Sequence, residues 1–311
     1  MVEQPETTIT LFLRRRKHLE RSIDLSKYDI PSIERATSKG NQLKWNIGEY
    51  WIKADGVGYE GLAEYIVSCI LEKSNVDRHC KYDVISIKYK TDVFTGCISR
   101  DFLPNGYTLV TLETLGRAFK NESIGEFLAK PGFAEDKVDV VINFLRELKI
   151  PEVEKYITAL MELDSLTLND DRHTNNIAFL RQDDVLIPAP IFDNGGALLS
   201  NTMEYSRQYS PRHLIANISA KPFSSSFFRQ KQIFERKYGQ NFQTRFTKDD
   251  LRACLDYAYS VYTDDQILKR VEITFLEQMD KNKDLFVEET RKEELPKKFK
   301  QQIIHDDYDE R

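Results

Sequence analysis

A polar cluster lies between Asp170 and Asn176, with apolar runs on either side. It contains two aspartates, one histidine and two asparagines. Asn and Asp favour turns for backbone reasons, so a plain polar turn is one interpretation. Carboxylate and carboxamide oxygens are also the ligands that magnesium prefers. The composition of the cluster fits a turn and a site equally.

Spacing favours a site. Asp171 precedes Asn176 with four residues between them, and Asp193 follows, with Gly195 two positions later. This D-x-x-x-x-N and D-x-G arrangement is typical of kinase active sites. Phosphoryl transfer needs a carboxylate that positions the attacking hydroxyl and oxygen ligands for the magnesium that neutralises the triphosphate. Asn176 and Asp193 could share that metal, and Gly195 would let the chain turn away after the ligand.

Lys53 offers the cation that phosphates need. It ends a predicted strand in YWIKADG, and Glu64 lies on the helix that follows. Kinases pair a strand lysine with a helix glutamate in this order. Ordinary surface positions are the alternative for both residues. Glu64 lies opposite the apolar stripe of its helix, which suits a cleft or water equally, and Glu60 is a rival partner.

Two regions of different periodicity must position these residues. From about residue 42 to 111 the chain has short strand-like runs, QLKWNI, YWIKA, DVISIKY and YTLVTL. One helix, GLAEYIVSCILEKSN, interrupts them with an apolar stripe. The later runs VDVVINFLREL, VEKYITALMELDSL, KDDLRACLDYAYSVY and TDDQILKRVEITFLEQM are amphipathic at helical spacing. We predict an α+β chain with a β-rich lobe of residues 1–112, a helical lobe of residues 113–280 and a charged tail of residues 281–311.

Local patterns add detail to the second lobe. NIAFL and VLIPAPIF flank the polar RQDDV and predict a β-hairpin, whose far end brings Asp193 beside Asn176. Thr247, with Asp250 behind it, and Thr263, with acids behind it, predict helix N-caps. A small β-rich lobe before a larger helical one predicts a cleft between the two.

Composition narrows the class of protein. The 311 residues, 41% of them hydrophobic, suffice for a sizeable core in two lobes. No run approaches the roughly 18 apolar residues of a membrane span, and the basic residues follow the short apolar start, the reverse of a secretion signal. We therefore expect a cytoplasmic protein without membrane contact. A net charge of -5 offers no general basic surface for nucleic acid, and the four cysteines contain no C-x-x-C pair for zinc.

Five motifs occur in a recognisable order: SKGNQLK, WIKADG, AEYIVSCILEKSNV, DDRHTNN and PIFDNG. Over about residues 38–200 they resemble the HipA-like serine/threonine kinases of bacteria. The family's S-x-x-G-x-Q-x-K phosphate loop is one residue longer than SKGNQLK, and its N-E-Y-x-x-x-x-L-A, D-x-H-x-x-N and P-x-Y-D motifs are similar to the last three segments. Phe192 replaces the tyrosine of P-x-Y-D. After Lys221 the resemblance is loose.

The resemblance implies a two-lobed kinase fold with ATP and Mg²⁺ as cofactors. Asp171 is then the catalytic base, Asn176 and Asp193 hold Mg²⁺, and Lys53, paired with Glu64, binds ATP phosphates. Thr111, Leu112 and Glu113 form a candidate hinge for adenine. The implied ATP-binding residues are Ser38, Gly40, Gln42, Lys44, Lys53, Thr111, Leu112 and Glu113.

The family also implies a protein substrate and phosphorylation of a serine in the kinase's own phosphate loop. We therefore expect autophosphorylation at Ser38 or, failing that, at Thr37, with plain turn residues as the alternative. Better-known members carry an extra N-terminal subdomain and often an antitoxin partner. Only about forty residues precede the phosphate loop here, which puts both a toxin role and an antitoxin partner in question.

Other functions could use the same residues. A small-molecule or lipid kinase would share Asp171, Asn176 and Asp193 and differ only in its acceptor site. A non-catalytic ATP-binding module commonly loses at least one of these three residues, and all are present here. A metal hydrolase built on Asp170, Asp171 and His173 would leave the lysine strand and the phosphate loop unexplained. His173 is better interpreted as a structural loop residue, because magnesium prefers oxygen.

Overall fold

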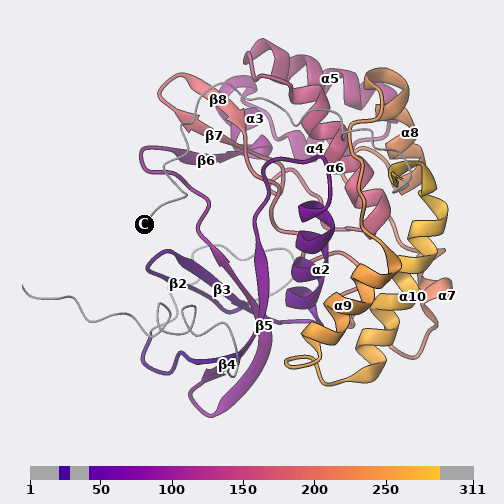
Figure 1. The fold of residues 1–311 in the computed structure, drawn as a ribbon. Helices are drawn as coiled ribbons and strands as arrows, with labels where there is room; N and C mark the ends of the chain where they lie inside the picture. Colours follow the sequence, from indigo (N-terminus) through magenta and orange to yellow (C-terminus); the bar gives the residue numbers. More distant parts are fainter. Residues whose placement is uncertain (1–20, 29–41, 288–311) are drawn as a thin grey trace, which may run out of the picture.

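A five-stranded sheet forms one side of the molecule (Figure 1). The computed structural model describes residues 21–28 and 42–287, and the strand order of this sheet is β1-β4-β5-β3-β2. β1 pairs in parallel with β4, and the other neighbours are antiparallel. The strands are β1 (Ser22–Asp24), β2 (Lys44–Ile47), β3 (Tyr50–Ala54), β4 (Tyr82–Tyr89) and β5 (Asp92–Arg100).

Alternation along β3 decides where its lysine points. Ile52 and Ala54 are buried in the core that covers one face of the sheet. Because successive side chains of a strand point to opposite faces, Lys53 emerges on the other face. That face is covered by α2 (Glu60–Glu72), which lies between the sheet and the remaining helices (Figure 1).

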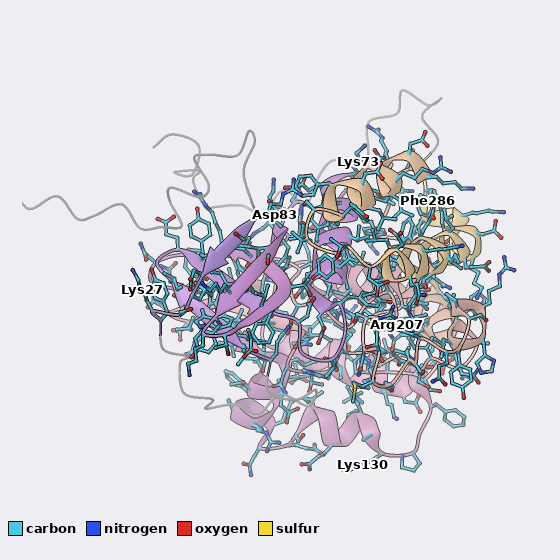
Figure 2. All side chains as sticks on the ribbon, turned by 90° about the horizontal axis from the view of Figure 1, so that it is seen from below. Lys27, Lys73, Asp83, Lys130, Arg207 and Phe286 are labelled. Atoms are coloured by element: carbon cyan, nitrogen blue, oxygen red, sulfur yellow. The ribbon has the colours of Figure 1, made fainter. Side chains whose placement is uncertain are left out.

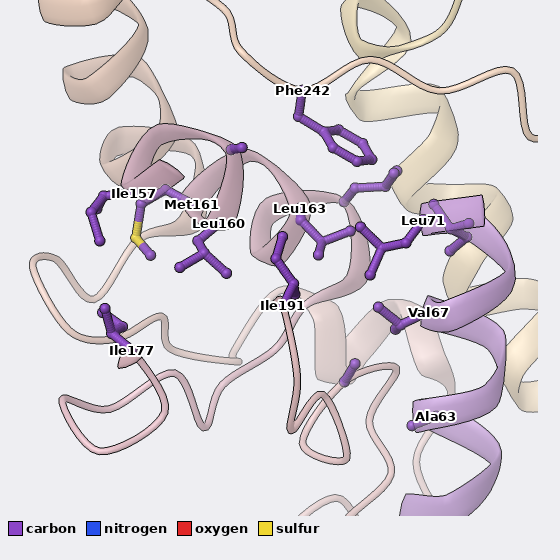
Figure 3. Packing of buried hydrophobic residues seen from close by; sticks show 14 of the residues in the cluster. Ala63, Val67, Leu71, Ile157, Leu160, Met161, Leu163, Ile177, Ile191 and Phe242 are labelled. Carbon is purple, nitrogen blue, oxygen red and sulfur yellow. The ribbon is translucent and has the colours of Figure 1, made fainter. Parts of the chain in front are cut away.

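Helix α2 shares its core with the helical part of the chain. Figure 3 shows Val67 and Leu71 of α2 facing Leu163 of α6 (Val153–Thr167), and all three belong to one buried cluster. At the C-terminal end of α2, Lys73 forms an ion pair of 2.6 Å with Asp250, and Figure 2 shows Lys73 beside the helix that carries that aspartate. The helix therefore links the sheet to the helical lobe.

A second sheet has three strands in the order β6-β7-β8, both pairs antiparallel. β7 (Ala178–Gln182) and β8 (Val185–Pro188) form the predicted hairpin. β6 (Thr108–Thr111) adds a strand that the sequence did not predict to join it. Since β6 pairs with β7 and not with the five-stranded sheet, the last residues of the predicted β-rich lobe lie with the helical part. The boundary after residue 112 stays a prediction.

Helices form most of the second lobe. The four predicted helical runs correspond to α5, α6, α9 and α10, whereas α3, α4, α7 and α8 were not predicted. The elements are α3 (Leu112–Lys120), α4 (Ile124–Ala129), α5 (Ala134–Glu147), α6, α7 (Pro211–Ile215), α8 (Phe227–Tyr238), α9 (Lys248–Ala258), α10 (Asp265–Lys281) and the 3₁₀ turn η1 (Lys283–Leu285). Leu285 is buried in the main core, so the predicted charged tail begins inside the fold. Between residues 42 and 287 and in residues 21–28, no helix has the length and apolar character to cross a membrane.

One of the two predicted N-caps is confirmed. Thr247 caps α9 in a capping box, in which its hydroxyl accepts from the Asp250 N–H and the Asp250 carboxylate accepts from the Thr247 N–H. The cap predicted at Thr263 is wrong by one residue, because Asp264 caps α10 instead. Aspartate ranks above threonine as an N-cap, which accounts for the shift.

Candidate functional site

Lys53 connects β3 with α2 and with the segment that follows the β7–β8 hairpin. Its Nζ lies 2.9 Å from Glu64 Oε1 and 3.1 Å from Asp193 Oδ1. The Lys53 side chain is 12% exposed and that of Glu64 only 2%, whereas Asp193 is 33% exposed. The strand lysine, the helix glutamate and the aspartate beyond the hairpin therefore meet at one point.

The rival glutamate has a different task. The Glu60 carboxylate accepts hydrogen bonds from the backbone N–H groups of Gly56, Val57 and Gly58, which fixes the loop before α2. Glu64, in contrast, holds Lys53 with one oxygen and accepts from the Asn194 N–H with the other, at 2.8 Å. Glu64 is thus the partner of Lys53, and it is buried and not exposed to water.

Mutual attraction keeps Lys53 and Asp193 charged. Burial would lower the pKa of Lys53, but Asp193 and Glu64 outweigh burial and raise that pKa well above its usual value. Burial opposes ionisation of Asp193 as well, yet Lys53 and Lys44 hold the pKa of its carboxyl far below the usual range. Burial raises the pKa of Glu64, and Lys53 offsets part of the rise. The site therefore contains an ionised carboxylate beside a fixed cation.

Lys44 lies directly opposite Lys53 in the β2–β3 register. Burial and the positive charge of Lys53 both lower the pKa of Lys44. Like charges opposite each other in a sheet are destabilising, so an anion bound between them would relieve the repulsion. Gln42 is half-buried just before β2. Ser38, Gly40 and the rest of the predicted phosphate loop before residue 42 lie outside the described residues.

The polar cluster forms a closed loop after α6. The N–H of His173 donates to the Asp171 carbonyl at 2.8 Å, and the N–H of Asn176 donates to the His173 carbonyl at 2.9 Å. The Asn176 amide Nδ2 also donates to the Asp171 carbonyl at 3.0 Å. Because an amide is planar, this bond turns Oδ1 of Asn176 to the opposite side, where it could serve as a metal ligand.

The segment after Asp193 approaches this loop closely. Asp193 itself has a left-handed backbone, with φ 56°. A Cβ placed on Gly196 would lie 2.6 Å from Cβ of Asp171, so only glycine fits there. At Gly195 the nearest atom would be 3.3 Å away, and the residue is not among those with a left-handed backbone. Glycine is therefore required at Gly196, which the sequence argument missed, more strictly than at Gly195.

The donor set fits a magnesium ion. The Asp193 carboxylate stays ionised, and Asn176 presents an amide oxygen, so both are hard oxygen ligands of the kind Mg²⁺ binds. The guanidinium of Arg172 donates to the carbonyls of Asn176 at 3.0 Å and of Phe192 at 3.2 Å. The two candidate ligand segments are therefore attached to one side chain, and Asn176 and Asp193 could hold the ion together.

The predicted hinge is built differently from the expectation. Thr111 caps α3, the N–H of Leu112 donates to the Ile177 carbonyl, and the N–H of Glu113 donates to the Thr174 carbonyl. Backbone donors of Leu112 and Glu113 are thus already used inside the helical lobe. Hydrogen-bonding direction alternates along an antiparallel strand, so the N–H of Thr111 is on the outer edge of β6 and remains the better candidate for adenine.

Three residues of the candidate site were not singled out from the sequence. Lys221 Nζ lies 3.9 Å from Asp171 Oδ1. Tyr82 accepts from the Asp193 N–H at 3.4 Å, and its ring lies 5.3 Å from Lys53 Nζ. Arg172 follows Asp171 and donates to the carbonyls of Asn176 and Phe192. Lys221 and Tyr82 have no local sequence signal, because they reach the site from distant parts of the chain. Arg172 lies in the polar cluster, but its contacts with Asp164, Phe192 and Asn194 become visible only in the folded chain.

Comparison with known proteins identifies the architecture. The crystal structure of the Helicobacter pylori proinflammatory kinase CtkA matches with a TM-score of 0.51 and 18% sequence identity, over 85% of this chain and 96% of that one. The chain has a two-lobed kinase fold. HipA of Shewanella oneidensis MR-1, solved with HipB and operator DNA, matches with a TM-score of 0.38 and 12% identity, over 91% of this chain and 76% of that one. No protein-family model and no curated protein matches the chain.

Proposed function

We propose that this kinase-fold protein is an ATP- and magnesium-dependent phosphotransferase, with serine or threonine of a protein as the acceptor. The observation that carries the proposal is the position of Lys53 between Glu64 and Asp193. A lysine held by a helix glutamate beside a metal-binding aspartate is the arrangement that places a cation on nucleotide phosphates in kinases. The kinase fold supports the same conclusion.

Each residue then has a defined task. Asp171, with a side chain 17% exposed, positions the acceptor hydroxyl and accepts its proton. Lys53 binds phosphate oxygens, and Asn176 and Asp193 hold Mg²⁺. The bound ion would neutralise charge on the triphosphate. Lys221, near Asp171, would add positive charge on the acceptor side.

The phosphate loop supports a proposal about regulation. A phosphate on Ser38 would add a charge of about -1.5 to -2. In the position expected for this loop, it would compete with ATP for Lys44 and Lys53, whose side chains share one face of the sheet. We therefore propose that autophosphorylation at Ser38, or at Thr37, lowers the activity.

Magnesium-dependent nucleotide binding tests the site. Asp193→Ala should abolish the thermal stabilisation by ATP that requires Mg²⁺. The variant should keep its fold, because Lys53 retains its ion pair with Glu64. An unchanged ATP-induced shift in the variant would reject Asp193 as a ligand. Labelling of a cell lysate with radioactive ATP then separates a protein acceptor from a small molecule or lipid.

A further inference from the structure

Arg172 is fully buried directly after the proposed base. Its side chain and that of Asp164 in α6 are both 0% exposed, and they form an ion pair of 3.0 Å. Arginine is rarely buried unless its charge is paired. Such a pair costs desolvation energy that packed hydrophobic side chains would avoid, so it is weak evidence for a purely stabilising role. The partners of Arg172 indicate another one.

Every N–H of the guanidinium has an acceptor. A guanidinium has five such donors in a rigid plane. Nε and one hydrogen of Nη2 bind the Asp164 carboxylate, and the second hydrogen of Nη2 binds Asn194 Oδ1 at 2.6 Å. Nη1 donates to the carbonyls of Asn176 and Phe192. The side chain is therefore fixed in position and orientation, with its charge paired by Asp164 of α6.

The remaining acceptors surround the two proposed magnesium ligands. Asn176 is one of these ligands, and its backbone carbonyl accepts a hydrogen bond from Arg172 Nη1. Phe192 and Asn194 are the residues on either side of Asp193, so Arg172 holds the backbone before this ligand and the side chain after it. The backbone of Asp193 is left-handed, a conformation that non-glycine residues adopt only at a cost. Contacts on both sides keep it there.

We propose that Arg172 is a positioning residue that sets the relative placement of Asn176 and Asp193 and thereby the affinity for magnesium. The inference rests on the proposed function, because it assumes that these two residues hold the ion. Outer residues that orient metal ligands typically change metal affinity by about 10- to 100-fold when they are replaced. Lysine is a poor substitute, because its single ammonium cannot reach four acceptors in different directions.

The test replaces the buried pair without leaving an unpaired charge. In the double variant Asp164→Leu, Arg172→Met, apolar side chains of similar length fill the space, and such replacements of buried ion pairs often preserve stability. We expect the Mg²⁺ concentration for half-maximal stabilisation by ATP to rise at least about tenfold. Without Mg²⁺, the ATP concentration for half-maximal stabilisation should stay within about twofold of the wild-type value, because Lys53 and Lys44 are unchanged.

Two further variants separate positioning from stability. Lys231→Met removes a different buried cation, a lysine that is 7% exposed and paired with Asp284 in the helical lobe. This variant should leave the Mg²⁺ requirement unchanged even if the melting temperature falls. Asn194→Ala keeps the Asp164 pair and removes one contact beside Asp193, so it should raise the Mg²⁺ requirement several-fold in a folded protein.

The outcomes distinguish this inference from the proposed function. Half-saturation by Mg²⁺ within twofold of the wild type, in a folded double variant or in Asn194→Ala, would overturn the role of Arg172 while the kinase proposal stands. Equal shifts in Lys231→Met would assign the effect to stability and overturn it as well. A wild-type protein whose ATP-induced stabilisation does not depend on Mg²⁺ would reject the proposed function, and the inference with it.

Discussion

Replacing Lys53 with methionine removes the cation that Glu64 and Asp193 share. The most affected partner is Glu64, which is 2% exposed and, among the described residues, would keep the N–H of Asn194 as its one donor. Removing one partner of a buried ion pair costs about 3–5 kcal/mol. Burial already raises the pKa of Glu64, so without Lys53 the carboxyl should take up a proton and limit the loss.

The loss of stability should therefore depend on pH. A carboxyl whose pKa is raised in the folded state favours folding at low pH and loses that contribution as pH rises through the folded value. We expect Lys53→Met to lose about 3 kcal/mol at pH 6, the lower end of the range for a broken buried pair, and more at pH 8. Urea unfolding at both pH values measures this difference.

Nucleotide binding by the same variant tests the function of the lysine. A charge-assisted contact to phosphate is worth about 1.5–3 kcal/mol, so ATP should bind at least about tenfold more weakly. Adenosine, which lacks phosphates, should bind as before. The control is Lys73→Met, whose ion pair with Asp250 is 49% exposed on the lysine side and should matter by less than about 1 kcal/mol.

Two results would refute the reasoning about Lys53. An unchanged urea midpoint would mean that the ion pair between Lys53 and Glu64 does not contribute to the free energy of unfolding. Equal weakening of ATP and adenosine would make Lys53 a structural residue. The double variant Lys53→Met, Glu64→Gln should recover stability, because it removes the buried carboxylate that has lost its partner. It should not recover ATP affinity, because the contact between Lys53 and the phosphates is still missing.

The remaining predictions concern turnover, charge and pH. Asp171→Asn should lower turnover by at least about a hundredfold and leave ATP affinity nearly unchanged. Steady-state kinetics and a binding titration measure the two quantities, and an equal fall in turnover and in ATP affinity would contradict the catalytic role of Asp171. Lys221→Met should lower turnover without changing the melting temperature, since its side chain is 51% exposed; wild-type kinetics would make it an ordinary surface residue. Burial, with the negative charge of Glu60, raises the pKa of Asp55 from 3.8 to about 7, so stability should fall as pH rises between these values, and melting curves of Asp55→Asn should lack that slope. Mass spectrometry after incubation with Mg-ATP should find phosphate on Ser38 in the wild type and none in Asp171→Asn, whereas an unmodified loop in an active enzyme would reject the regulatory proposal.

Periodicity predicted the elements that have one buried face. The strands β2 and β3, the helices α5, α6, α9 and α10, and the β7–β8 hairpin all match runs read from the sequence. The adjacency of Asp193 and Asn176 followed from the hairpin alone, and Arg172 joins their segments as expected for neighbours. Local patterns were sufficient wherever the contact partners are close in sequence.

Glu64 shows where a periodic argument fails. It lies opposite the apolar stripe of α2, and one helix cannot tell whether that face meets water or another element. The five-stranded sheet covers it, so the residue is buried and paired with Lys53. Strand β5 was not predicted either, and the role of its glycine also depends on a neighbouring element. Its Gly96 is needed because a Cβ there would lie 2.1 Å from the carbonyl oxygen of Lys53, a contact that only the assembled sheet creates.

Arg172 could not have been assigned from the sequence. Arginine is usually exposed, and the acceptors that bury it come from α6, from its own loop and from the segment around Asp193. Residues of this kind, which hold others in place, depend on contacts far apart in the chain. The sequence predicts which groups would touch ATP and magnesium, and the structure shows the contacts that Arg172 makes around two of them.

Transfer of the γ-phosphate from radiolabelled ATP is the most direct test of the proposed function. Purified wild-type protein, with Mg²⁺ and with a cell lysate as the source of acceptors, should incorporate label into serine or threonine of protein, and this should disappear on removal of Mg²⁺ or in Asp171→Asn. The folded Asp171→Asn variant should still bind Mg-ATP. Label incorporated equally by wild type and Asp171→Asn, or no transfer by a wild-type protein that binds Mg-ATP, would contradict the assignment of this site as the active site of a protein kinase.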